Sequence, residues 1–144
     1  MKKIFLLFVS VALVGASLTS CSSDDNGGSS SEIVGKWYAE KTTYTFMGQQ
    51  TEQAYTHACP SEKDYVNFKS NGNFVYAEYY STCELFEDNG TWVINGNELT
   101  LTQDGGAEQT IATIVTLTST KLVIKIDDED TGGLITDVEV HYKK

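Results

Sequence analysis

The sequence predicts an all-β domain: an eight-stranded antiparallel up-and-down meander that closes into a barrel. From Glu32 onward, apolar and polar residues alternate with a period of two, the pattern of half-buried strands. Asn-Gly and Asp-Gly pairs, which accept the positive φ angles of tight turns, separate the alternating stretches. The chain has one proline and no stretch of clear helical periodicity. With no helix to cover the sheet edges, closure into a barrel removes them.

The expected strands follow one another through short turns. The four turn pairs are Asn71-Gly72, Asn89-Gly90, Asn95-Gly96 and Asp104-Gly105. Residues 49–56 lack the alternation and are expected to form a helical turn or a long loop. The strands are expected at residues 37–46, 65–68, 73–80, 90–94, 98–102, 110–117, 121–126 and 137–143.

The alternation also assigns side chains to the two faces of the sheet. In the strand at 73–80, Phe74, Tyr76 and Tyr80 share a face with Glu78, which would be a residue of the barrel mouth or a polar contact for a ligand. The other side chains expected to point inward are Trp92, Ile94, Leu99, Leu101, Leu122, Ile124, Ile126, Val138, Val140 and Tyr142.

The first 20 residues have the layout of a secretory signal: Lys2 and Lys3, an apolar run at 4–14, then small residues. The run is shorter than the roughly 20 apolar residues that span a bilayer. Leu18-Thr19-Ser20-Cys21 resembles the lipobox of bacterial lipoproteins, which implies cleavage before Cys21 and acylation on it. The resemblance therefore implies a lipid-anchored protein whose membrane contact is the anchor.

Residues 21–31 are rich in Ser, Gly and Asp and are expected to be a flexible tether, leaving 32–144 as the barrel domain. Ser-Ser-Asp-Asp after the cysteine resembles the acidic export tag of surface lipoproteins. Ser22 next to Cys21 resembles the sorting signal for the outer membrane. The expected location is the outer membrane of a Gram-negative bacterium, with the protein exposed on the cell surface. The alternative interpretation of the acidic segment is that it serves only as a spacer.

The charge of the chain argues against nucleic acid as a partner. Without Lys2 and Lys3, 8 lysines remain against 20 acidic residues, a formal net charge of −12, and there is no arginine. Phosphate backbones would repel such a chain, which also lacks the guanidinium fork that reads bases.

Three cysteines remain to be paired or left free. If Cys21 carries the lipid, Cys59 and Cys83 can form a disulfide in an oxidising compartment. The alternatives are two buried thiols or a metal site with His57, although zinc normally takes about four closely spaced ligands.

Gly35-Lys36-Trp37 at the start of the first strand resembles the lipocalin superfamily, in which the tryptophan packs across the closed end of the barrel. The hairpin at 89–102, with its Gly-Thr-Trp and Leu-Thr-Leu-Thr segments, is similar to that of compact bacterial lipocalin-like lipoproteins. So is the placement of the cysteines around the segment from Phe68 to Phe74. One departure is that no arginine is present to stack on Trp37, as that family's last strand usually supplies.

The resemblance implies a membrane-anchored barrel that binds a small, largely apolar ligand without catalysis. The candidate ligand residues are Trp37, Phe74, Tyr76, Glu78, Trp92 and Leu101. The aromatic side chains would either fill the core or line a cavity with a few polar contacts. The alternative function is a packed barrel whose outer surface contacts a protein or glycan partner.

Catalytic signatures are absent from the sequence, so no enzyme activity, catalytic residue, cofactor or metal site is expected. His57 and His141 are the only histidines, and no Gly-x-Ser-x-Gly elbow or Gly-rich phosphate loop occurs. His141 is expected on the solvent face of the last strand. The acidic run at 127–133 lacks the order of a calcium loop and is expected to be a solvated hairpin loop.

Overall fold

The computed structural model describes residues 30–104, 106, 108–127 and 135–144. The signal peptide, the lipidation site at Cys21, most of the tether and nearly all of the acidic run at 127–133 lie outside the described residues. Ser30 and Ser31, assigned to the tether from the sequence, belong to a short helix. The elements are α1 (Ser30–Ile33), β1 (Gly35–Phe46), β2 (Gln49–Ala54), β3 (Tyr65–Phe68), β4 (Asn73–Tyr79), β5 (Leu85–Asn95), β6 (Glu98–Gln103), β7 (Gln109–Leu117), β8 (Lys121–Asp127) and β9 (Ile135–Lys143).

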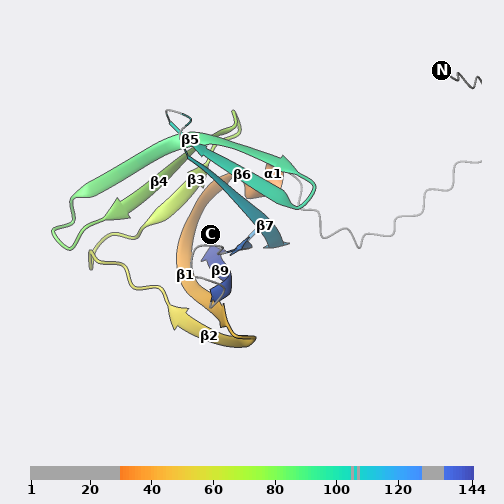
Figure 1. The fold of residues 1–144 in the computed structure, drawn as a ribbon. Helices are drawn as coiled ribbons and strands as arrows, with labels where there is room; N and C mark the ends of the chain where they lie inside the picture. Colours follow the sequence, from red (N-terminus) through yellow and green to blue (C-terminus); the bar gives the residue numbers. More distant parts are fainter. Residues whose placement is uncertain (1–29, 105, 107, 128–134) are drawn as a thin grey trace, which may run out of the picture.

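Eight of the strands form a closed antiparallel barrel, as the sequence predicts. Strands β3 to β9 pair in chain order, and β1 pairs with β3 along one edge and with β9 along the other. Figure 1 shows the long curved β1 beside the C-terminal strand β9, the contact that closes the sheet. The period-two pattern explains the result, because each strand buries one face against the barrel axis.

Strand β2 corrects the expectation of a helical turn or loop at 49–56. It pairs with the second half of β1, from Lys41↔Ala54 to Phe46↔Gln49, and forms a ribbon beyond the barrel (Figure 1). Met47 and Gly48, both with positive φ, make the turn. Every residue of β2 is exposed, so its sequence lacks the apolar alternation by which a half-buried strand is recognised.

The Asn89-Gly90 pair is not a turn, which corrects a second expectation. Both residues lie within β5, which begins at Leu85 and runs without a break to Asn95. The ring of Phe74 covers Gly90 so closely that a Cβ there would lie 2.6 Å from its Cε1 atom. Gly90 is therefore required by packing across the sheet and not by a turn.

The core closes one end of the barrel, where α1 and the β3–β4, β5–β6 and β7–β8 hairpins lie. Trp37 is fully buried there, and its indole nitrogen donates a hydrogen bond of 2.6 Å to the carbonyl of Ile33 in α1. Trp92 donates from its indole nitrogen to the carbonyls of Lys69 and Asn73, both at 3.1 Å. We call this the plugged end.

Lys144 occupies the position for which the sequence offers no arginine. Its Nζ lies 4.4 Å from the centre of the Trp37 ring and donates to the carbonyls of Glu32 and Val34, both at 3.0 Å. Gly35, with φ of 127°, permits this approach, since its missing Cβ would lie 3.2 Å from the Lys144 side chain. The glycine of Gly35-Lys36-Trp37 thus has a packing role.

The predicted disulfide between Cys59 and Cys83 is present, with the Cα atoms 5.0 Å apart. It joins the loop that precedes β3 to the turn between β4 and β5. In the part of the chain that is described, no helix has the length and apolar character needed to cross a membrane.

Candidate functional site

The barrel encloses a chamber of about 270 Å³ between the plugged end and the opposite end. Most of its wall is apolar, because the inward residues of β3, β6 and β8 meet there. These residues are Val66, Phe68, Leu101, Leu122, Ile124 and Ile126. Phe74 of β4 completes the apolar wall. We call this space the inner chamber.

The inner chamber reaches solvent at the end of the barrel away from α1. Its polar residues gather on that side: Asp88 near the start of β5, Gln103 at the end of β6 and Thr110 near the start of β7. Gln103 and Thr110 are exposed and Asp88 is half-buried. An amphipathic molecule can therefore place its apolar part among the aliphatic side chains and its polar group at this mouth.

A second space of about 180 Å³, the side chamber, adjoins the inner chamber. Tyr76 and Tyr142 line both, so the two rings stand between them. Tyr55 and Asp64 contribute polar groups to the wall of the side chamber. Burial raises the pKa of the Tyr76 and Tyr142 hydroxyls above the usual tyrosine range. Both hydroxyls are neutral at ordinary pH and can donate hydrogen bonds.

Among the described residues that line the side chamber, Asp64 is the only charged one, and it is 4% exposed. Its Oδ2 accepts a hydrogen bond of 2.8 Å from the Tyr55 hydroxyl, and its Oδ1 accepts one of 2.7 Å from the backbone NH of Tyr79. Its own backbone NH donates to Nδ1 of His57 at 3.0 Å. Burial and the bond to Asp64 raise the pKa of Tyr55.

These contacts give His57 and Asp64 a structural role: they fasten the loop before β3 to the barrel, beside the disulfide. Among the described residues, no three His, Cys, Asp or Glu side chains come together as a metal site.

The candidate ligand residues fall into three places. Phe74, Tyr76 and Leu101 line the inner chamber. Trp37 and Trp92 are packed into the core at the plugged end. Glu78 lines neither chamber, but its charge acts on Tyr76 and raises the pKa of that hydroxyl.

Sequence reasoning placed Leu122, Ile124, Ile126 and Tyr142 on the inward face without recognising them as cavity residues. It missed Tyr55 and Asp64, and it did not associate Asp88 with a cavity. The sequence carries one weak signal for Asp64: an acidic residue directly before a strand whose inward side is apolar. Nothing comparable distinguishes Asp88 among the 20 acidic residues.

His141 lies on the outward side of β9, as expected, but its side chain is only 13% exposed. Its Nε2 is 3.1 Å from the Thr43 hydroxyl, and its Nδ1 is buried without a hydrogen-bond partner in the described structure. Burial lowers the pKa of His141, and the nearby charge of Lys41 adds to the effect.

A profile of the lipocalin-like domain family matches residues 33–124, more than half of the chain. The fold is similar to that of a lipocalin-like protein from Bacteroides uniformis, with TM-score 0.58 and 13% identity over 78% of this chain and 98% of that one. An uncharacterized protein from Bacteroides eggerthii gives TM-score 0.54 at 13% identity, over 78% of this chain and 98% of that one.

Lobster apocrustacyanin A1 has a TM-score of 0.50 at 13% identity, over 80% of this chain and 62% of that one. No curated protein matches the sequence. At these identities the solved structures establish the fold and nothing finer.

Proposed function

The chain belongs to the lipocalin-like domain family, and on that premise we propose that it is a membrane-anchored lipoprotein whose barrel binds a small, largely apolar ligand without covalent chemistry. The observation that carries the proposal is the inner chamber, a mostly apolar space of about 270 Å³ whose polar residues, apart from Tyr76 and Tyr142, lie at its mouth. Together with the side chamber it falls within the size range of small-molecule sites. The alternative of a packed barrel requires side chains that meet across the axis, and the chambers count against it.

The chemistry of the lining narrows the class of ligand. Within the part of the chain that the structure describes, the charged groups that line the two chambers are the carboxylates Asp64 and Asp88, and no lysine lines either chamber. A fatty acid would bring its own carboxylate beside these groups and gain no ion pair. The lining therefore favours a neutral or amine-bearing apolar molecule whose donors meet Asp88 and the tyrosine hydroxyls.

Mass spectrometry of the intact protein, purified from its own host under native conditions, tests the ligand. We expect an additional mass of a few hundred daltons that is lost on denaturation. An apolar fluorescent probe, N-phenyl-1-naphthylamine, gives an independent measurement. The proposal fails if no ligand co-purifies and the probe does not bind either.

A pair of variants tests the location of the ligand. Leu101→Trp adds an indole to the wall of the inner chamber and should displace the probe. Ile111→Trp makes a related change on the next strand at a side chain that is 58% exposed, outside the barrel, and should leave binding unchanged. Equal affinities in the two variants would place the probe elsewhere.

The lipobox-like segment supports anchoring through Cys21, and the acidic segment behind it supports display on the cell surface of a Gram-negative bacterium. Cys21→Ser should move the protein from the membrane fraction to the soluble fraction, and continued retention in the membrane would refute the anchor. Digestion by protease added to intact cells tests the exposure to the medium.

A further inference from the structure

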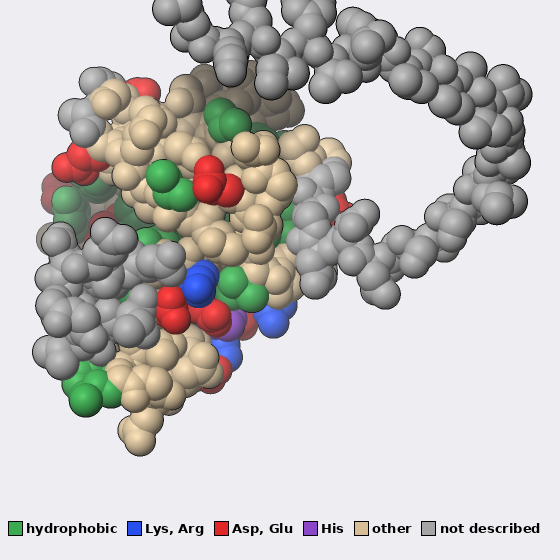
Figure 2. Space-filling model, turned by 45° about the vertical axis from the view of Figure 1, so that its right-hand side comes forward, with side chains coloured by type: hydrophobic (Ala, Val, Ile, Leu, Met, Phe, Trp, Pro, Cys, Tyr) green, Lys and Arg blue, Asp and Glu red, His purple; other side chains and the backbone are tan. Residues whose placement is uncertain are grey.

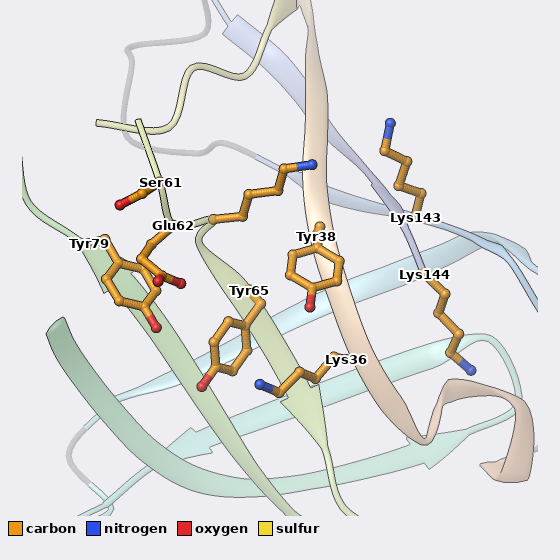
Figure 3. A pocket seen from close by; sticks show the side chains of 9 residues that line it. Lys36, Tyr38, Ser61, Glu62, Tyr65, Tyr79, Lys143 and Lys144 are labelled. Carbon is orange, nitrogen blue, oxygen red and sulfur yellow. The ribbon is translucent and has the colours of Figure 1, made fainter. Parts of the chain in front are cut away.

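A cleft on the outside of the barrel gathers lysines and tyrosines. Its volume is about 470 Å³, and it lies over β1, β3 and β4, bounded by the end of β9 and the loop before β3 (Figure 3). Half of the eight lysines that follow Cys21 line it, although the chain carries 20 acidic residues. We call it the lysine–tyrosine cleft.

The strand register builds its floor. Tyr38 of β1 pairs with Tyr65 of β3 on one side and with Lys143 of β9 on the other, so the three side chains leave the sheet on the same face. The Tyr38 and Tyr65 rings meet edge to face with their centres 6.2 Å apart. Tyr79 of β4 continues the row, and Figure 3 shows the three tyrosines side by side.

Two of the lysines in the cleft have no acidic partner among the described residues. Lys36 lies with its Nζ 3.9 Å from the centre of the Tyr65 ring, and Lys63 comes from the loop before β3. Lys143, in contrast, forms an ion pair of 2.9 Å with Glu40. Glu62 also lines the cleft, so its lysines outnumber its carboxylates.

Two of the four lysines outside the cleft form ion pairs, whereas Lys69 and Lys121 have no ion pair among the described residues. Lys41 pairs with Glu52 at 2.5 Å, and Lys125 pairs with Asp137 at 3.3 Å. Figure 2 shows basic and acidic side chains intermingled on one face of the molecule. The distinguishing feature of the cleft is that its two unpaired cations lie beside a row of aromatic rings, a combination that marks a binding surface.

We propose that the lysine–tyrosine cleft binds an acidic glycan, at a site separate from the inner chamber. Sugar rings present CH groups that pack flat against tyrosine faces, and their hydroxyls exchange hydrogen bonds with the tyrosine hydroxyls. Uronate or sulfate groups would pair with Lys36 and Lys63 through charge-assisted hydrogen bonds, which are stronger than hydrogen bonds between neutral groups. Concavity, flat rings and isolated cations are each suited to a narrow anionic chain.

The same charges argue against an anionic bilayer as the occupant. A flat membrane would face the whole surface, whose net charge is negative, whereas a single glycan strand touches only the cleft. At physiological ionic strength the Debye length is about 8 Å, so lysines within the cleft dominate over acidic residues farther away.

Isothermal titration of the full chain with tetragalacturonate and with a sulfated heparin tetrasaccharide tests the proposal, with neutral maltotetraose as the comparison. At least one acidic tetrasaccharide should bind, maltotetraose should not, and raising the salt should weaken binding. Lys36→Gln combined with Lys63→Gln should reduce affinity by about tenfold or more. Tyr79→Ser should weaken binding through the loss of stacking.

The matched control is Lys69→Gln combined with Lys125→Gln, which removes the same charge away from the cleft and should leave affinity within about twofold. Equal losses in the two double variants would overturn the proposal. So would binding of maltotetraose as tight as that of the acidic sugars, or no binding of either acidic sugar. Anionic phosphatidylglycerol vesicles that bind where the sugars do not would identify a membrane-facing surface instead.

Glycan binding in the cleft and ligand binding in the barrel can be measured independently. Binding of N-phenyl-1-naphthylamine in the barrel should be the same in the Lys36/Lys63 variant and in the parent chain. That result also shows that the variant is folded.

Discussion

Replacing Gly90 by alanine should strongly destabilise the barrel, although the residue lies in an ordinary strand. The added Cβ would lie 2.2 Å from the carbonyl oxygen of Thr102 and 2.6 Å from Cε1 of Phe74. Ordinary contact begins near 3.4 Å, so the backbone of β6 must move by about 1 Å and the ring of Phe74 must shift as well. Overpacking of a core costs roughly 1–3 kcal/mol, and a clash with backbone belongs at the upper end.

We therefore expect the free energy of unfolding to fall by about 3 kcal/mol and the melting temperature by roughly 10 °C. Urea and thermal denaturation followed by circular dichroism measure both. Gly96→Ala is the control: nothing lies within 4 Å of its Cβ, and only its φ of 64° is unfavourable for alanine. That change should cost about 1 kcal/mol.

A double-mutant cycle tests the mechanism. Phe74→Leu removes the ring atoms that the new Cβ meets, so the two changes together should cost less than their sum, by about 0.5 kcal/mol or more. The reasoning is refuted if the free energy of unfolding of Gly90→Ala lies within about 0.5 kcal/mol of that of the parent chain. Because Phe74 lines the inner chamber, its displacement should also weaken binding of the apolar probe.

Three further predictions follow from single contacts. Changing Cys59 and Cys83 to serine should lower the free energy of unfolding by about 3 kcal/mol, since the disulfide closes a loop of roughly 25 residues; unchanged urea midpoints with and without reductant would contradict this. Burial lowers the pKa of His141, so the unfolded chain binds more protons and stability falls as the pH drops below about 6.5. His141→Gln should flatten the fall in urea midpoint between roughly pH 7.5 and 5.5, and equal slopes would exclude the effect. Lys144→Met should lower the free energy of unfolding by about 1–2 kcal/mol and alter the fluorescence of Trp37, whereas Lys144→Arg should leave stability and fluorescence unchanged. If Lys144→Met leaves the free energy of unfolding unchanged, the contact with Trp37 does not contribute to stability.

The eight barrel strands were predictable because each has one buried face, which imposes a period of two. Strand β2 was not, since all its residues are exposed and its pairing depends on β1 alone. The expectation of a turn at Asn89-Gly90 was wrong for a related reason. The dipeptide is typical of a tight turn, but its glycine also fits beneath the ring of Phe74 on the neighbouring strand. Local sequence does not distinguish these two uses.

For the ligand site, the sequence predicted only which side chains face the interior of the barrel. Alternation placed Tyr76, Leu101 and Tyr142 inward, but whether inward side chains meet or leave a chamber depends on their packing in three dimensions. The contacts of Asp64 with Tyr55 and Tyr79 join residues from a loop and two strand ends. The lysine–tyrosine cleft likewise depends on the register of β9, β1 and β3, which no single stretch of sequence reveals.

The position of α1 has a consequence for the orientation of the molecule. The described chain begins at Ser30 beside the plugged end, whereas Gln103 and Thr110 mark the mouth of the chamber at the other end. A lipid on Cys21 would thus be connected to the barrel at its plugged end. A spin label at position 103 should then relax readily with water-soluble reagents and poorly with reagents dissolved in the lipid. A ligand of the inner chamber would then enter from the aqueous medium. The barrel would open away from the bilayer and would not extract molecules from it.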